Sequence, residues 1–385
     1  MNDSRPYSLI LNCAALVLIA GAVFFLLSRP IPPPSPLIAV TASSSAQTAS
    51  VALSATSSAA TATTQIATVT GTKAASLPQP ATSTAASPGM VSRIQNPYSF
   101  PSLSPELINT DAREALVNIL CMPRGGSLSP TSGSGVIVDP RGIILTNAHV
   151  AQYVLLAEDP RVDLSCTIRT GAPASARWIP EVLYIPPAWV NAHVGDILNP
   201  HPTGTGEHDY ALLIVTGSVD GSPLPQTFPY LTPDTREAVA FQGDSVLVAS
   251  YPAEFLGGIT NEYQLFPVSS FTTVGQLLTF GAGSPDVLSL GGIIEAQSGS
   301  SGGAVVNAWG RLVALIVTTS AGASTAQRDL HALALSYINS DIATQSGSDV
   351  AQLFSGDIFA KAQAFNRTAA PQLIQSYIDK LLGAH

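Results

Sequence analysis

Basic residues are scarce in this chain of 385 residues, which has 16 Lys and Arg against 25 Asp and Glu and a formal net charge of -9. A surface of that sign repels a phosphate backbone, because nucleic-acid binding depends on Lys and Arg to neutralise phosphates. Nucleic acid is therefore excluded as a partner. No repeat of solenoid period is present either, which excludes an array of stacked repeat units.

Cysteine is almost absent, with three in the whole chain. Cys13 stands inside an apolar run, so Cys121 and Cys166 are the one remaining pair. In an oxidising compartment they can bond and close a loop that contains His149. Two buried free thiols are the alternative. The sequence leaves both open, because it does not show whether their Cα atoms approach within about 7 Å.

Charge is missing from residues 8–27, "SLILNCAALVLIAGAVFFLL". Twenty uncharged and mostly apolar residues are about the length that crosses a hydrocarbon layer of ~30 Å as a helix. A cleaved signal peptide is the alternative, but its apolar core is usually about 7 to 15 residues long, and no small-x-small site precedes the prolines after Leu27. We predict a short cytoplasmic tail (1–7), an uncleaved single-pass anchor in the cell membrane (8–27), and the remainder outside the cytoplasm, in the periplasm or at the cell surface.

Bulky apolar residues are few in the next segment. Between residues 41 and 90, 35 of 50 residues are Ala, Ser or Thr, and Lys73 is the only charge. Such a stretch buries too little apolar surface to offset the entropy of ordering. We predict a disordered linker over residues 28–104.

Short apolar runs separated by Gly and Pro begin after Pro97, among them "GSGVIVD", "GIILTNA", "YALLIVTG" and "HALALSYI". Strands at this spacing predict an all-β sandwich or barrel, here over residues 105–345, with Trp309-Gly310 as a hairpin turn. The sequence of residues 346–385 predicts a helical C-terminal extension. Within it, "PQLIQSYIDKLL" places its large apolar residues on one face, which is expected to pack against the barrel.

The stretch "EAQSGSSGGAVV" at 295–306 places a serine on a tight Gly-rich turn between two predicted strands. Reading it as Gly-x-Ser-Gly-Gly selects Ser301 rather than Ser300 or Ser298. The N-H groups of Gly299 and Ser301 would then converge on the oxyanion of a tetrahedral intermediate. Ser/Gly turns are common, so this hypothesis also requires a base and an orienting carboxylate.

The base is predicted to be His149, at the end of the apolar strand in "GIILTNAHV", where a loop presents the ring to a cleft. The carboxylate is predicted to be Asp209 in "GEHDYALLIV", since an acid ahead of a buried strand can hold the imidazole and stabilise its cation. Asp139 and Asp220 look like turn residues. The other histidines have poorer contexts: His193, His201, His208, His331 and His385.

Together these blocks resemble the trypsin-like serine peptidases, in particular the bacterial HtrA-like branch. The resemblance rests on "GSGVIVDPRGIILTNAHV", "HDYALLIV" and "GSSGGAVVNAWGRLVALIV", which stand where that family has its catalytic blocks, and it covers roughly residues 110 to 340. It implies a double β-barrel, with His149 as general acid/base, Asp209 as its orienting group and Ser301 as nucleophile. Gly299 and Ser301 would supply the oxyanion donors, and no metal or cofactor is needed.

Two departures from the family matter. Digestive members have an Asp before the nucleophile that pairs with a new N-terminus, whereas this chain has Ser300. Regulated HtrA proteases carry a PDZ domain after the barrels, and about 45 residues follow residue 341, too few for one. Glu295 lies six positions before Ser301, where trypsin-like folds place the base of the primary pocket. A carboxylate there would attract Lys or Arg, whereas a solvent-facing strand glutamate is the plainer alternative.

The sequence therefore predicts a membrane-anchored serine endopeptidase whose substrates are polypeptides. Two alternatives stay open. One is a binding module with the same barrels but no chemistry, and the other is a stalk protein whose tether and anchor are the functional part. The oligomeric state is not indicated.

Overall fold

The computed structural model describes residues 84–85, 93–94, 96–199, 204–237, 239–254, 264–281 and 284–383. The predicted tail (1–7) and anchor (8–27) lie outside these residues, as does most of the predicted linker. Among the helices of the described ranges, none has both the length and the apolar character that a bilayer span requires.

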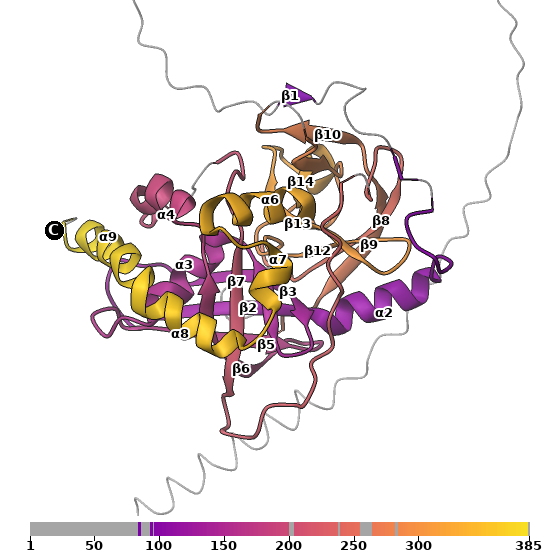
Figure 1. The fold of residues 1–385 in the computed structure, drawn as a ribbon. Helices are drawn as coiled ribbons and strands as arrows, with labels where there is room; N and C mark the ends of the chain where they lie inside the picture. Colours follow the sequence, from indigo (N-terminus) through magenta and orange to yellow (C-terminus); the bar gives the residue numbers. More distant parts are fainter. Residues whose placement is uncertain are drawn as a thin grey trace, which may run out of the picture. The chain divides into compact units, whose positions relative to one another are not determined.

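Six antiparallel strands form a closed barrel in the order β2-β3-β4-β7-β6-β5 (Figure 1). Their inward side chains are aliphatic, as the apolar runs in the sequence predict, and the hairpin between β3 and β4 turns at Gly142 with a φ of 88°. The strands are β2 (Leu116–Pro123), β3 (Thr131–Asp139), β4 (Ile143–Thr146), β5 (Leu164–Thr170), β6 (Ser175–Tyr184) and β7 (Ala211–Ser218).

The second sheet has eight strands in the order β1-β10-β11-β14-β13-β12-β8-β9. Its two end strands, β1 and β9, do not pair with each other within the described residues. The predicted second barrel is therefore an open half-barrel rather than a closed one. The strands are β1 (Thr84–Ala85), β8 (Ser245–Ser250), β9 (Val268–Thr273), β10 (Gln276–Thr279), β11 (Val287–Ser289), β12 (Ala304–Asn307), β13 (Leu312–Thr319) and β14 (Leu330–Ala334).

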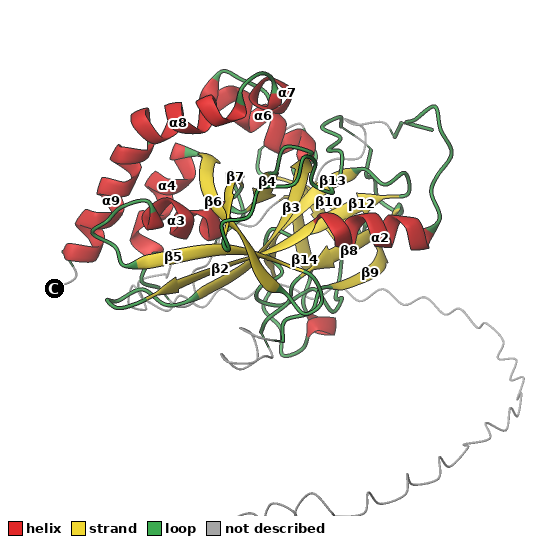
Figure 2. Ribbon diagram, turned by 90° about the horizontal axis from the view of Figure 1, so that it is seen from below, coloured by secondary structure: helices red, strands yellow, loops and turns green. Residues whose placement is uncertain are grey.

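Helices precede, connect and follow the two sheets. The C-terminal helices α8 and α9 lie on the outside of the closed barrel, where α8 contacts β6, and α9 contacts α3 and α4 (Figure 2). The helices are α2 (Pro105–Ala115), α3 (Ala148–Ala157), α4 (Pro187–His193), α6 (Leu335–Ser346), α7 (Val350–Phe354), α8 (Ile358–Thr368) and α9 (Ala370–Leu382), with 3-10 turns η1 (Val194–Asp196) and η2 (Thr325–Gln327).

Two predicted strands end earlier than expected and continue as helices. The "GIILTNA" strand stops at Thr146, and α3 starts two residues later, so His149 lies in a helix rather than a loop. The "HALALSYI" run splits into β14 and α6, because Leu335, Ile338 and Ile342 recur at helical spacing and are all buried. Short apolar runs fit either period, so only packing decides them.

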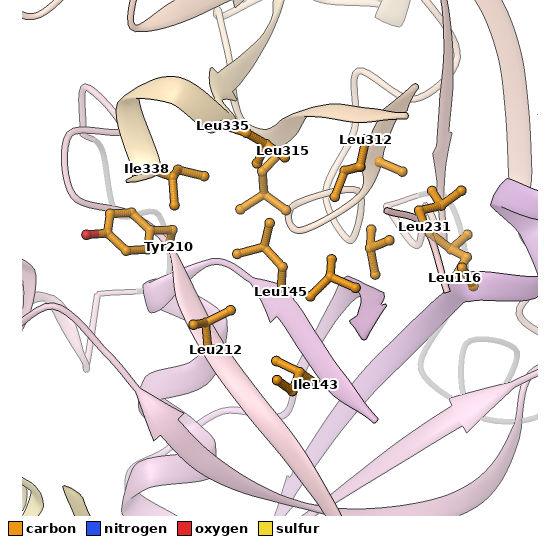
Figure 3. Close-up of a cluster of buried hydrophobic side chains, with 14 of the residues drawn as sticks. Leu116, Ile143, Leu145, Tyr210, Leu212, Leu231, Leu312, Leu315, Leu335 and Ile338 are labelled. Atoms are coloured by element: carbon orange, nitrogen blue, oxygen red, sulfur yellow. The ribbon is translucent and has the colours of Figure 1, made fainter. Parts of the chain in front are cut away.

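One apolar cluster joins the two sheets. Leu145 on β4 and Leu212 on β7 come from the closed barrel, and they meet Leu315 on β13 and the α6 residues Leu335 and Ile338 (Figure 3). All five are at most 4% exposed. Burial of side chains of this size stabilises a protein by about 1.5 to 3 kcal/mol each, so the cluster fixes the sheets against one another.

The folded part begins before the predicted boundary at residue 105. Tyr98 donates a hydrogen bond of 2.6 Å to the Asp234 carboxylate, and Leu103 N-H donates to the carbonyl oxygen of Ala308 at 2.9 Å. The Tyr98 ring also lies between Phe100 and Trp309. These contacts correct the predicted linker, because residues 98 and 103 belong to the folded part and bring aromatic and apolar surface that the Ala/Ser/Thr segment lacks. Strand β1 also lies within the predicted linker and pairs with β10.

The structure joins Cys121 on β2 and Cys166 on β5 by a disulfide. The two residues are direct partners in the antiparallel register of the barrel, with Cα atoms 4.1 Å apart. The bond closes a loop with a sequence separation of 45 residues, and α3 lies within this loop.

Replacing both cysteines, Cys121→Ser with Cys166→Ser, is expected to lower the free energy of unfolding by about 2 to 4 kcal/mol, because the unfolded chain gains loop entropy. For a domain of this size the thermal midpoint should fall by about 4 to 10 °C, measured by calorimetry on the full chain in detergent. Dithiothreitol should lower the midpoint of the wild type and leave that of the double variant unchanged. Equal sensitivity of both proteins to the reductant would contradict the disulfide.

Candidate active site

His149 on α3 and Asp209, which precedes β7, form a close pair. The ring Nδ1 of His149 lies 2.7 Å from Asp209 Oδ2, and the backbone N-H of His149 donates to Oδ1 at 2.9 Å. Because a carboxylate only accepts, the proton of a neutral ring stays on Nδ1, and Nε2 is left as the basic nitrogen. The geometry thus selects the tautomer that a general base needs.

The position of Asp209 follows from local structure on both sides. Residue 209 directly precedes β7, and its carbonyl oxygen accepts a hydrogen bond of 2.7 Å from the Asn147 side chain, the N-cap residue of α3. Its carboxylate therefore meets the first turn of α3, where free N-H groups and the helix dipole favour a negative charge. Asp209 is 6% exposed, so water weakens these interactions little.

Burial and charge act on the His149 imidazole in opposite directions. Burial lowers the pKa of His149, but the adjacent Asp209 carboxylate favours the cation by charge and by hydrogen bond, and the pKa ends above its usual value of 6.5. A ring of raised pKa accepts a proton readily, and a buried counter-charge stabilises the imidazolium that forms.

Ser301 lies on a tight turn between β11 and β12, and Ser134 on β3 of the closed barrel holds this turn. The Ser134 N-H donates to the Ser301 carbonyl oxygen at 2.7 Å, and its hydroxyl donates to the carbonyl oxygen of Gly299 at 2.7 Å. At Gly302, with a φ of 86°, a Cβ would lie 2.0 Å from the Ser134 carbonyl oxygen. The absence of a side chain there lets the turn meet β3.

The N-H groups of Gly299 and Ser301 are available for a ligand, since neither donates to another described residue. The carbonyl oxygen of Ser298 accepts from Ala253 N-H at 2.8 Å. In a planar trans peptide the C=O and the next N-H point in opposite directions, so the Gly299 N-H points away from Ala253. This arrangement is what an oxyanion hole requires.

A cavity of about 420 Å³ connects these groups. Its lining includes His149, Gly299 and Ser301, with further walls from the β2-β3 connection and from the α4-η1 segment. Within the described residues the Ser301 hydroxyl makes no hydrogen bond of its own. Catalytic hydrogen bonds are often long before substrate binds and shorten in the complex. The structure thus places two side chains of the predicted triad, His149 and Ser301, in the lining of one cavity. The third, Asp209, is hydrogen-bonded to His149.

Comparison with known families agrees with this geometry. Residues 133–315 match the family model of the trypsin-like peptidase domain. The match runs from β3 into β13 and includes His149, Asp209 and Ser301. This part of the chain is therefore similar to a trypsin-like peptidase domain, and a barrel, a half-barrel and C-terminal helices fit that fold. A search of curated proteins finds no match.

Glu295 is buried, at 0% exposure, so the alternative of a solvent-facing strand residue is wrong. Its Oε2 accepts a hydrogen bond of 2.7 Å from Ser270 on β9, and its Oε1 has no partner among the described residues. Burial raises the pKa of Glu295. Glu295 does not line the cavity that holds His149 and Ser301.

The remaining histidines have partners of their own. His208 Nδ1 lies 2.9 Å from Asp341 on α6, His193 lies 3.0 Å from Asp196, and His331 lies 3.2 Å from Asp329. His193 and Asp196 also line the cavity, which the sequence did not indicate. His201 and His385 lie outside the described residues. In the described ranges no three His, Cys, Asp or Glu side chains group together as metal ligands.

Sequence reasoning missed the residues that hold the site together, namely Ser134, Thr146 and Asn147. Thr146 donates to the carbonyl oxygen of Ser134 at 2.7 Å, and both residues are fully buried. One signal was present for Ser134, which stands between two glycines at the start of an apolar strand. Glycines in a strand often mark a close backbone approach.

Asp209→Asn is expected to lower the pKa of His149, because the amide removes the charge that raises it. An NMR titration of labelled histidine, in a Ser301→Ala background so that no turnover interferes, should give a pKa for His149 above 6.5 and a lower one after the substitution. In the active chain, Asp209→Asn should reduce kcat by about three to four orders of magnitude. An unchanged His149 pKa would contradict the pairing.

Gly299→Ala is expected to reduce kcat by about 100- to 1000-fold, the loss typical of one oxyanion donor. The new Cβ would lie 2.8 Å from Ala253 N at a φ of 90°, so the Ser298–Gly299 peptide must move. Gly347→Ala is the matched control, because Gly347 has a φ of 72° with nothing within 4 Å and caps α6. It should keep its kcat, measured on the same peptide substrate. Equal losses in both variants would assign the effect to backbone strain alone.

Proposed function

We propose that this protein is a serine endopeptidase that hydrolyses polypeptides through an acyl-enzyme, with His149, Asp209 and Ser301 as its triad. The observation that carries the proposal is one cleft that holds a serine, a histidine paired with a buried carboxylate, and two free N-H groups. Chance assembly of all these features is rare, and the peptidase-family match covers the same residues.

The first half of the reaction forms the acyl-enzyme. The Ser301 Oγ attacks the carbonyl carbon of the scissile bond while His149 Nε2 takes the hydroxyl proton. The carbonyl oxygen becomes an oxyanion and accepts hydrogen bonds from the N-H groups of Gly299 and Ser301. The intermediate then collapses, the C-N bond breaks, and His149 gives its proton to the leaving amine.

The second half returns the enzyme to its starting state. Water takes the place of the amine, and His149 removes a proton from it as the water oxygen attacks the ester carbon. Collapse of the second intermediate releases a carboxylic acid and restores the proton to Ser301. Asp209 keeps its charge throughout and stabilises the imidazolium in both halves.

Within the family we favour the HtrA-like branch, supported by the three sequence blocks around the triad and by Ser300 in place of an activating Asp. The basic preference from Glu295 stays a prediction. Its burial, its raised pKa and its hydrogen bond to Ser270 all weaken the attraction for Lys or Arg. Cleavage sites on a peptide library decide between basic and small aliphatic residues before the scissile bond.

We also propose that residues 8–27 anchor the chain in the cell membrane, with the peptidase domain outside the cytoplasm. An uncharged run of membrane length supports this, as does a disulfide, which persists in oxidising compartments. Resistance to alkaline carbonate extraction, lost on deletion of residues 8–27, tests the anchor. Protease accessibility in intact cells tests on which side of the membrane the peptidase domain lies.

The catalytic proposal is tested with a fluorophosphonate probe, which labels only an activated serine. The wild type should be labelled, whereas Ser301→Ala and His149→Ala should lose labelling by at least about 1000-fold, because the attacking alkoxide depends on both groups. Ser376→Ala on α9 and His331→Ala on β14 are the matched controls and should label like the wild type. Absence of labelling in a folded wild type would leave a binding module as the function.

A further inference from the structure

The turn that carries Ser301 has an uncharged residue, Ser300, directly before the serine. Ser300 is 1% exposed, and its hydroxyl lies 3.0 Å from the Ser250 hydroxyl, so a neutral hydrogen bond occupies this position. An oxyanion hole must be held within about 0.5 Å of its working geometry, because its donors act on one developing charge. Ser134 supports the turn from the closed barrel, but residues 296–298 need support from another side.

Glu254 and Arg328 form a two-pronged ion pair on that other side. Arg328 Nη1 lies 2.6 Å from Glu254 Oε2, and Nη2 lies 2.7 Å from Oε1. The Arg328 side chain is 15% exposed and the Glu254 side chain 26%. A bidentate and partly shielded pair has a fixed geometry that a single-contact surface pair lacks.

Both partners also bind the backbone of the oxyanion turn. Glu254 Oε2 accepts a hydrogen bond of 3.1 Å from Ser298 N-H, and Arg328 Nη1 donates to the Ala296 carbonyl oxygen at 2.9 Å. Arg328 Nε donates to the Gly322 carbonyl oxygen at 3.1 Å. The pair thus links the segment after β8, the oxyanion turn and the β13-β14 connection.

The contacts at residue 298 set the plane of the critical peptide. Glu254 holds its N-H, and the backbone of Ala253 holds its C=O, so both polar groups of Ser298 are bound to adjacent residues of one segment. With that C=O fixed, the Gly299 N-H points to the opposite side of the peptide, away from Ala253. Glu254 binds the N-H of the preceding peptide, so loss of this contact would release one side of Ser298 and make it easier for the Ser298–Gly299 peptide to rotate its carbonyl oxygen into the oxyanion site.

We propose that Glu254 and Arg328 are positioning residues that hold the Ser298–Gly299 peptide in its productive orientation. This inference rests on the proposed peptidase function and adds to it. Neither residue touches the reacting atoms. Their effect is confined to a donor that acts on the transition state, so their loss should lower kcat and leave substrate binding nearly unchanged.

The test compares Glu254→Gln and Arg328→Lys with the wild-type full chain on one quenched fluorescent peptide taken from the library. Each variant should lower kcat about 10- to 100-fold, below the loss for a removed oxyanion donor, with KM within about twofold. A peptide boronic acid, whose tetrahedral adduct uses the oxyanion donors, should lose inhibition by the same factor as kcat. A purely structural role would not make the loss of boronic acid inhibition equal to the loss of kcat.

Arg161→Lys is the matched control. Arg161 forms a two-pronged ion pair with Asp159 just after α3, at 2.9 and 2.7 Å. Within the described residues its side chain binds Asp159 and Gln375 and not the Ser301 turn or the triad, so Arg161→Lys should leave kcat unchanged. Thermal midpoints of all variants show whether each remains folded at the assay temperature.

The outcomes separate the inference from the function beneath it. Unchanged kcat in Glu254→Gln and Arg328→Lys, or a raised KM alone, overturns the positioning role while the peptidase function stands. Unfolding of both variants beside a folded Arg161→Lys also overturns it, because the pair is then structural. A wild type without Ser301-dependent turnover overturns the proposed function instead.

Discussion

The contact between the Ser301 turn and Ser134 is the constraint on which the site depends. Ser134 belongs to the closed barrel, and the turn belongs to the second sheet, so these hydrogen bonds bring Ser301 to the same cavity as His149, which comes from the other half of the fold. The apolar cluster of Leu145, Leu212 and Leu315 fixes the sheets against each other. Apolar packing is not directional, and the hydrogen bonds of Ser134 supply the register that it lacks.

The second requirement is a negative charge kept out of water. Asp209 is costly to bury by itself, but the first turn of α3 gives it the His149 N-H and the positive end of a helix dipole. The same arrangement raises the pKa of His149 and fixes its tautomer. The start of α3 therefore both stabilises the buried Asp209 carboxylate and places the His149 ring against it. This explains why His149 lies on a helix and not on a loop.

Much of the site was predictable from local sequence. Ser301, His149 and Asp209 each follow or precede an apolar run, and their residue types define the chemistry, so pattern and chemical role suffice to nominate them. The supporting groups were not predictable, because their contacts join distant segments. Ser134 binds Gly299 across 165 residues, and Glu254 and Arg328 bind the turn across 44 and 32 residues. Thr146 acts between two strands whose pairing the sequence does not state. The burial of Glu295 likewise depends on Ser270, a partner 25 residues away.

The sequence by itself determined the all-β class of the domain, the amphipathic C-terminal helix and the residue types of the triad, because periodicity and side-chain chemistry are local properties. Only the tertiary structure decided that the second sheet stays open, that the strand before His149 becomes a helix, and that the two cysteines bond. It also decided which residues support the oxyanion turn. These outcomes depend on distances between segments far apart in the chain, and such distances are set by packing and hydrogen bonding after the chain has folded.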